Sequence, residues 1–120
     1  MRTVLVVDDD ADCRMMLEQT LAFEGFRVVC ACNGKEALAR AHEQRPGVIL
    51  LDLMMPIMSG YEFRQNQQRD PSLADIPIVC ISGTYNAEAH ARDIAAVACF
   101  TKPLQLDALI ATIRAMLPRE

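Results

Sequence analysis

Residues 47–52 read GVILLD, an apolar run that stops abruptly on the carboxylate of Asp52. A run of this length predicts a buried strand, because strands of parallel sheets read as nearly continuous apolar stretches. The carboxylate then lies at the edge of the sheet, where loops meet solvent. The N-terminal residues 3–10, TVLVVDDD, repeat the pattern. Two buried strands that both end in acids predict that these acids lie together and bind one cation.

Short apolar segments alternate with helical patterns along the whole chain. Each strand-plus-helix unit takes about 20 to 30 residues, as the crossover between parallel strands requires. The alternation predicts one α/β domain over residues 1–120, with a five-stranded parallel sheet and helices on both faces. We expect the strands to begin near Thr3, Phe26, Gly47, Ile76 and Ala98.

Capping residues and apolar spacing predict the helices. Asp10 and Asn33 are expected N-caps, Ser59 with Glu62 has the spacing of a capping box, and Gly25 is a stop signal. The helices are expected over about 11–24, from Asn33 to before Pro46, from Ser59 to about Gln68, from after Asn86 to near Ala96, and from Leu106 to about Leu117.

The composition is that of an ordinary globular domain, with 52% apolar and 23% charged residues. A net charge of −4 without any Lys or Arg block gives no electrostatic case for binding nucleic acid or an anionic membrane. The longest apolar run is far short of a membrane span, and no signal peptide precedes the first strand. We therefore expect a cytoplasmic protein.

The chain has five cysteines, and most lie within apolar segments. Cys30 and Cys32 could suggest a metal pair, but no second Cys or His pair is placed to complete a zinc site. An odd count in a cytoplasmic protein favours reduced cysteines that pack in the core. This expectation covers Cys13, Cys30, Cys32, Cys80 and Cys99.

Ligands of an open doubly wound sheet bind at the carboxyl ends of the strands, where the strand order reverses. Without a cation, several carboxylates collected there would repel one another, and one would have to protonate. A hard divalent ion removes the conflict, and Mg²⁺ suits carboxylate and carbonyl oxygens. The residues expected at this edge are Asp8, Asp9, Asp52, Ser82, Gly83 and Lys102.

A phosphoryl group would explain why a lysine accompanies the acids. Phosphoryl transfer is catalysed mainly by positioning and charge neutralisation, and a carboxylate can itself be the nucleophile. On this hypothesis Asp52 attacks the phosphorus and Asp9 holds the metal. Lys102 and Ser82 bind the phosphoryl oxygens, and Gly83 lets the backbone approach them.

Four segments together carry a resemblance to a known family. They are VVDD at 6–9, LDLMMPIMSG at 51–60, ISG at 81–83 and TKP at 101–103. In this order and spacing they resemble the receiver domain of bacterial two-component response regulators, over essentially all 120 residues. The resemblance implies a flavodoxin-like doubly wound (βα)5 fold with strand order 2-1-3-4-5.

The resemblance implies a role for each acid. Asp52 is the expected phosphoacceptor. Asp9 binds Mg²⁺ directly, or Mn²⁺ in its place, and Asp8 acts mostly through water. Asp52 and the backbone carbonyl of Met54 complete the expected protein ligands.

It also implies roles for the two later strands. Ser82 occupies the position of the switch hydroxyl and, with Gly83, binds the phosphoryl group. Lys102 is the expected phosphate-binding lysine, usually followed by a cis peptide bond at Pro103.

The family takes its phosphoryl group from a phosphohistidine on a sensor histidine kinase or a histidine phosphotransfer protein. The resemblance therefore implies a signalling protein that phosphorylates itself and loses its own acyl phosphate, with no turnover of external substrates. A downstream effector is expected on the face formed by the fourth helix, fifth strand and fifth helix, and a homodimer is possible. No output domain follows, so both a stand-alone receiver and one cut from a longer regulator or hybrid kinase fit.

Two features depart from the family pattern. Cys99 stands where many receivers carry a switch aromatic, and Phe100 is expected on the opposite face of its strand. The third helix is unusually polar, and Arg64 and Gln67 stand where aliphatic residues are common. Of a partner surface and a well-solvated helix, we favour the solvated helix.

Two other classes of function are weighed against the signalling module. A Mg²⁺-dependent phosphohydrolase would also use an aspartyl nucleophile, but it generally needs a second acid two residues later, where this chain has Met54. A receiver-like scaffold without phosphorylation is disfavoured by the intact set of Asp9, Asp52, Ser82 and Lys102.

Overall fold

The computed structural model describes residues 2–55, 57–83, 89 and 92–117. Five parallel strands form one sheet in the order β2-β1-β3-β4-β5. The strands are β1 (Thr3–Val7), β2 (Arg27–Ala31), β3 (Val48–Asp52), β4 (Ile78–Ser82) and β5 (Ala98–Thr101). Each starts within two residues of its predicted position, so the predicted fold class and strand order are confirmed.

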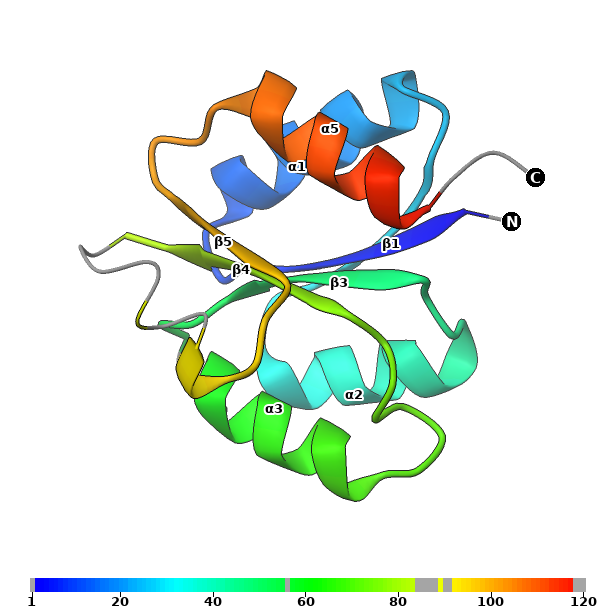
Figure 1. The fold of residues 1–120 in the computed structure, drawn as a ribbon, viewed down its shortest axis with the longest axis vertical. Coiled ribbons are helices and arrows are strands. Elements are labelled where there is room, and N and C mark those ends of the chain that lie inside the picture. The colour runs from blue at the N-terminus through cyan, green and yellow to red at the C-terminus, as the bar shows by residue number, and fades with distance from the viewer. Residues whose placement is uncertain (1, 56, 84–88, 90–91, 118–120) are drawn as a thin grey trace.

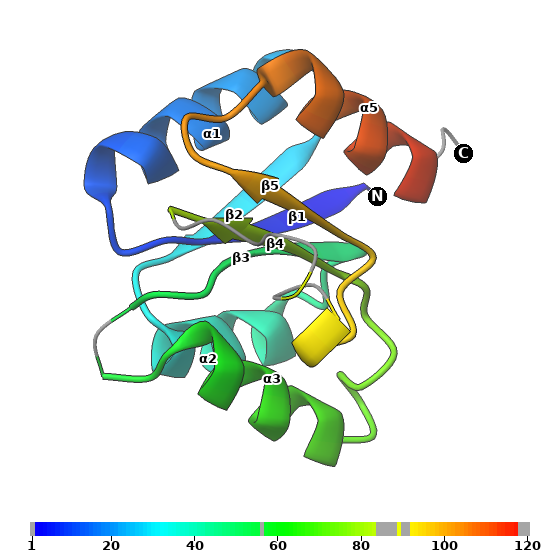
Figure 2. The ribbon, with the colours of Figure 1, turned by 60° about the vertical axis from the view of Figure 1, so that its left-hand side comes forward.

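Among the described residues, four helices cover the sheet, α1 and α5 on one face and α2 and α3 on the other (Figures 1 and 2). Within the described ranges no helix combines the length and apolar character needed to cross a bilayer. Of the helix expected after Asn86 and up to Ala96, positions 87, 88, 90 and 91 lie outside the described residues, 89, 92 and 93 are helical, and 94–96 are not helical. The helix bounds are α1 (Ala11–Phe23), α2 (Gly34–Glu43), α3 (Gly60–Arg69) and α5 (Leu106–Met116).

The helix ends follow the predicted capping signals. Asp10 accepts hydrogen bonds from two backbone N–H groups of the first turn of α1, and Ser59 and Glu62 form a reciprocal capping box at α3. Gly25 has a φ of +94°, a left-handed conformation that glycine adopts without steric cost. It ends α1, and the chain then turns into β2.

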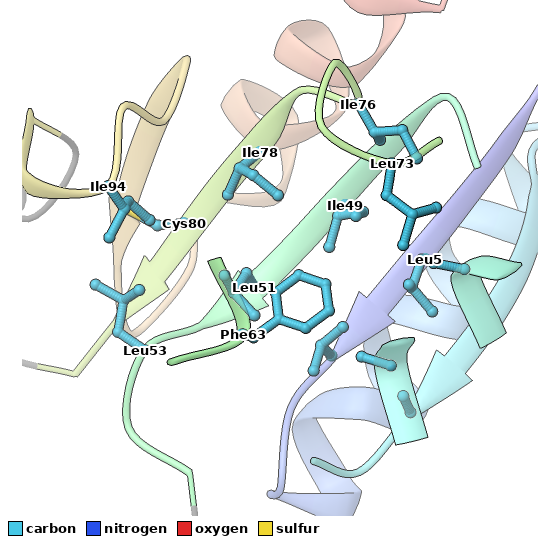
Figure 3. Packing of buried hydrophobic residues seen from close by; sticks show 14 residues of the cluster. Leu5, Ile49, Leu51, Leu53, Phe63, Leu73, Ile76, Ile78, Cys80 and Ile94 are labelled. Carbon is cyan, nitrogen blue, oxygen red and sulfur yellow. The ribbon is translucent and has the colours of Figure 1, made fainter. Parts of the chain in front are cut away.

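Two separate apolar clusters lie on the two faces of the sheet. Because successive strand residues point to opposite faces, Leu5 and Val7 join the cluster under α2 and α3, whereas Val4 and Val6 join the one under α1 and α5. Figure 3 shows the first cluster, in which Phe63 of α3 lies over the sheet. The second cluster contains Leu17, Leu21, Leu109, Ile110 and Ile113 from the helices.

The expectation that Arg64 and Gln67 are solvated is wrong, because both side chains are buried. The Arg64 guanidinium donates to the backbone carbonyls of Ile94 at 2.7 Å and Ala95 at 3.3 Å, and to Oε1 of Gln67 at 2.7 Å. Gln67 in turn donates to the carbonyl of Ile76, and also to that of Leu73, at 2.9 Å each. These polar side chains therefore satisfy backbone groups of two loops, which a solvated helix would not do.

The expectation that all five cysteines are reduced is also wrong. Cys80 of β4 and Cys99 of β5 form a disulfide across directly paired positions of the two strands. Cys13, Cys30 and Cys32 are free, as expected. Phe100 packs in the cluster on the opposite face from Cys99, so the predicted reversal of faces at this position is confirmed.

Candidate functional site

The site lies where the order of the sheet reverses, between β1 and β3. Val7 pairs with Leu51, so the residues that follow each of them, Asp8 and Asp52, lie side by side at the carboxyl edge. Carboxylate oxygens of Asp8, Asp9 and Asp52 all lie within 4.8 Å of one another. Asp8 and Asp52 are buried, whereas Asp9 is exposed and faces solvent. The three acids that the sequence predicted to meet are therefore together.

Lys102 provides the positive charge of this cluster. Its ammonium Nζ lies 3.1 Å from Oδ2 of Asp8 and 3.5 Å from Oδ2 of Asp52. The backbone N–H of Lys102 donates to the carbonyl of Ser82 at 2.8 Å, which ties the end of β5 to the end of β4. The peptide bond between Lys102 and Pro103 is cis, as the family resemblance implied.

The two buried carboxyl groups have opposite pKa shifts. Burial, with the neighbouring Asp8 carboxylate, raises the pKa of Asp52 to about 6, despite a hydrogen bond from the Met54 N–H. Burial also acts to raise the pKa of Asp8, but hydrogen bonds, chiefly from the Asp10 N–H, hold it below its usual value. The pKa of Lys102 is raised, because attraction to these two acids outweighs its own burial. Of the two acids, Asp8 therefore favours the anionic form, and Asp52 is the one whose pKa lies closer to neutral pH.

One buried oxygen supports a cation at this edge. Oδ2 of Asp8 accepts no hydrogen bond, although the Lys102 ammonium lies close to it. A buried carboxylate oxygen without a donor is costly, and a metal ion would satisfy it. The oxygen-only set from Asp8, Asp9 and Asp52 has the donor chemistry that hard divalent cations prefer. The residues present therefore fit a divalent cation.

The loop after β3 holds Asp52 in place. Its Oδ1 accepts a hydrogen bond from the Met54 N–H at 3.0 Å, and the Gly60 N–H donates to the Leu53 carbonyl at 3.1 Å. A Cβ on Gly60 would lie 2.7 Å from the Cα of Leu53 and 2.8 Å from the carbonyl oxygen of Asp52. The first turn of α3 thus approaches the backbone of the site as closely as only glycine allows. The Met54 side chain itself is 64% exposed.

Ser82 and Gly83 occupy the predicted end of β4. Ser82 is buried and pairs with Thr101 of β5. A Cβ added to Gly83 would meet nothing within 4 Å, so space is open above this residue. Cys99 lies three residues before Lys102, but its side chain points into the cluster under α2 and α3 and is bonded to Cys80.

Two residues of α1 that the sequence reasoning missed support Asp8. The Arg14 guanidinium donates to the Asp8 backbone carbonyl at 2.7 Å. Burial, and then the hydrogen bond that the Cys13 thiol makes to the Asp8 carboxylate, raise the pKa of Cys13 to about 12. The available signal was their place in the first turn of a helix that directly follows the acid cluster, because such a turn must pack beside it.

A parallel sheet of order 2-1-3-4-5 with acids at the reversal of strand order defines a flavodoxin-like doubly wound α/β protein with a charged site at its sheet edge. Residues 4–114 match the family model described as the response regulator receiver domain. The chain belongs to this family, whose members are signalling proteins of two-component systems.

Curated relatives agree with this assignment. The probable transcriptional regulator ycf27 of Guillardia theta is 37% identical over 118 residues, which are 97% of this chain and 45% of that protein. The phosphate regulon transcriptional regulatory protein PhoB of Pseudomonas aeruginosa is 33% identical over 120 residues, with 98% and 52% covered. The chain spans about half the length of these relatives.

Solved structures share the whole fold. The chemotaxis protein CheY4 of Vibrio cholerae superposes with a TM-score of 0.88 at 32% identity and covers 98% of this chain and 99% of its own. The response regulator TrrA of Thermotoga maritima, solved in complex with Mg²⁺-BeF, has a TM-score of 0.85 at 27% identity, with 98% and 100% covered.

Proposed function

We propose that Asp52 of this receiver domain accepts a phosphoryl group from a phosphohistidine of a sensor histidine kinase or a histidine phosphotransfer protein. The observation that carries the proposal is the buried Asp52 carboxylate, placed between a second buried acid and a lysine at the reversal of the sheet. A carboxylate oxygen of Asp52 forms the new bond to phosphorus. The phosphorus–nitrogen bond of the donor breaks, and its imidazole leaves.

The ionisation of Asp52 suits a nucleophile. Since its pKa is raised to about 6, the carboxylate is basic for an aspartate and yet mostly ionised near pH 7. Hydrogen bonds, chiefly from the Asp10 N–H, hold the pKa of Asp8 below its usual value despite burial, which favours its anionic form. The Lys102 ammonium is 3.5 Å from the Asp52 carboxylate, so a small movement of its side chain brings it into contact with the oxygens of an arriving phosphoryl group.

The remaining site residues have positioning roles in this proposal. Mg²⁺, or Mn²⁺ in its place, would be held by Asp8, Asp9, Asp52 and the backbone carbonyl of Met54, and would supply charge neutralisation for the phosphoryl oxygens. The hydroxyl of Ser82 and the backbone at Gly83 offer hydrogen-bond donors beside open space, as the fit of a Cβ at Gly83 indicates. The proposed phosphoryl-binding groups are Ser82, Gly83 and Lys102.

The proposed role is switching, without turnover of external substrates. Residues 1–120 act as one receiver domain in the cytoplasm, and the phosphoryl group changes the face expected to comprise the fourth helix, β5 and α5. An effector protein or domain, or a second copy of the chain, reads this face, and the domain itself contacts neither nucleic acid nor membrane. Met54, an exposed apolar residue two positions after Asp52, argues against hydrolysis of external phosphate esters.

The test is the intact mass of the protein after incubation with Mg²⁺ and acetyl phosphate. We expect a gain of one phosphoryl group in the wild type that requires Mg²⁺ and is lost in Asp52→Asn. Asp107→Asn, which removes an exposed acid of α5, is the matched control and should gain the group normally. Phosphorylation of Asp52→Asn at the wild-type rate would refute the assignment.

A further inference from the structure

The disulfide lies between two strands that both deliver groups to the site. Cys80 and Cys99 are directly opposite in the parallel pair β4–β5, with Cα atoms 4.4 Å apart. This separation lies within the range that a disulfide spans, so the pair can close without movement of the backbone. Cys80 is fully buried and Cys99 is half-buried. Of these two cysteines, Cys99 is therefore the one that a reagent from solvent can reach.

The other three thiols lie in a different chemical environment. Cys30 donates to a carboxylate oxygen of Glu18 at 3.4 Å, and Cys32 donates to one of Glu36 at the same distance. Cys13 contacts the Asp8 carboxylate. Burial, and then the Glu18 carboxylate, raise the pKa of Cys30 to about 11, which disfavours its thiolate, the reactive form of cysteine. In the described part of the chain these three thiols are free, whereas Cys80 and Cys99 are bonded at paired strand positions, so we assign oxidation to the strand pair.

The disulfide is close to the groups that would bind a phosphoryl group. Cys80 precedes Ser82 by two residues on β4, and Cys99 of β5 precedes Lys102, the first residue after that strand, by three. The two strand ends are already joined by the hydrogen bond from the Lys102 N–H to the Ser82 carbonyl. A covalent bond between these strands fixes their separation next to this hydrogen bond. It also fixes the side chain of Cys99, which packs against the cluster that contains Ile94. Figure 3 shows Cys80 and Ile94 of this cluster.

We propose that Cys80 and Cys99 are a reversible thiol–disulfide pair whose oxidation lowers the ability of the domain to take up and hold a phosphoryl group at Asp52. The inference rests on the proposed function. Lys102 now contacts Asp8 and Asp52, so its side chain must shift to reach phosphoryl oxygens, and its backbone bond to the Ser82 carbonyl couples this shift to the end of β4. The reduced strands can make this adjustment, whereas the disulfide resists it. Disulfides in a reducing cytoplasm are usually transient and redox-sensing, which fits a regulatory bond.

Hydrogen peroxide is the oxidant in the redox step. The thiolate of Cys99 attacks the peroxide, the oxygen–oxygen bond breaks, and a sulfenic acid and one water form after proton transfer. The Cys80 sulfur then attacks the sulfenic sulfur, and a second water leaves. Two thiols thus lose two electrons and two protons in total. A dithiol reductant restores them by thiol–disulfide exchange.

The first part of the test counts thiols. Wild type is treated with hydrogen peroxide or with dithiothreitol, denatured, alkylated with iodoacetamide and weighed. We expect three alkylated cysteines after oxidation and five after reduction, and peptide mapping should place the bond at Cys80 and Cys99. Five alkylated cysteines after oxidation, or a bond between other positions, would overturn the proposal.

The second part compares phosphorylation of the two forms with Mg²⁺ and acetyl phosphate. We expect the oxidised protein to hold less phosphoryl group at steady state and to lose it faster, by roughly threefold to thirtyfold, the range seen for coupling through a packed neighbouring element. Cys99→Val, with Cys99→Ala as a second variant if the first fails to fold, should abolish this redox dependence. Cys32→Ala is the matched control and should keep it.

The outcomes separate the two proposals. Equal phosphoryl lifetimes in oxidised and reduced wild type would overturn the regulatory inference while the proposed function stands. Redox dependence that persists in Cys99→Val would overturn it as well. Absence of any phosphoryl gain in the reduced wild type would overturn the proposed function and with it the regulatory inference, whatever the thiol count.

Discussion

Replacing Gln67 with methionine tests the buried polar network under α3. Gln67 is fully buried and makes three hydrogen bonds: it donates to the carbonyls of Leu73 and Ile76, and it accepts from Arg64. Methionine has a similar volume and adapts its shape, so Gln67→Met removes the hydrogen bonds with little change in packing. Two buried carbonyls and one guanidinium N–H are then left without a partner.

The expected cost follows from this count. A buried polar group that loses its partner costs about 1–3 kcal/mol, so three such groups cost about 3–5 kcal/mol once the better burial of the apolar side chain is allowed for. Domains of this size have a free energy of unfolding of about 5–15 kcal/mol, so the variant should fold with much of its stability lost. For a chain of this length, Tm should fall by roughly 10–20 °C.

The assay is urea unfolding followed by far-UV circular dichroism at 25 °C, with thermal unfolding as a second measurement. Gln68→Met, at the exposed neighbouring position of the same helix, is the control and should change the unfolding free energy by less than about 0.5 kcal/mol. A loss below about 1 kcal/mol in Gln67→Met, or an equal loss in both variants, would refute the view that this network satisfies the two loops.

Three further predictions concern the site and its supports. Gly60→Ala should lower the free energy of unfolding by about 1–3 kcal/mol, because its Cβ meets the backbone of Leu53, whereas Gly83→Ala should leave Tm unchanged in the same thermal scan. In metal-free buffer, Asp52→Asn should be more stable than wild type at pH 7. The difference in unfolding free energy, up to about 2–3 kcal/mol, should shrink as the pH falls from about 6 to about 4. Because the pKa of Asp52 is raised in the folded wild type, the folded protein binds a proton in this range that the unfolded chain does not. A constant difference in urea titrations across this range would contradict the raised pKa. Asp10→Ala removes the side-chain acceptor for two N–H groups of α1 and should cost about 1 kcal/mol by urea unfolding, and an unchanged midpoint would show that the cap contributes nothing.

The strands and the acids of the site could be predicted because their signals are local. An apolar run that ends on a carboxylate, as at Asp8 and Asp52, reports both the strand and the edge where it stops. The reversal of strand order then brings the two ends together. Lys102 was predicted from its place before Pro103, and its contact with both acids agrees with that reasoning.

The errors concern partners that are distant in the sequence. Arg64 and Gln67 give α3 a polar composition that is typical of a solvated helix. Their acceptors belong to other loops, and Ile94 is thirty residues from Arg64 along the chain. Cys80 and Cys99 were likewise judged by the apolar character of their own segments. Their bond depends on the register between β4 and β5, which neither segment reveals by itself.

The sheet divides the apolar core into two clusters that pack independently of each other. In the described part of the chain the clusters share no residue, since neighbouring positions on each strand face opposite sides. Substitutions under α2 and α3 and substitutions under α1 and α5 should therefore combine almost additively. One side of the molecule can diverge in sequence while the other keeps its packing, so two partners could impose independent demands on one small domain. The charged edge is the place where both sides meet, because the strands of both clusters end there.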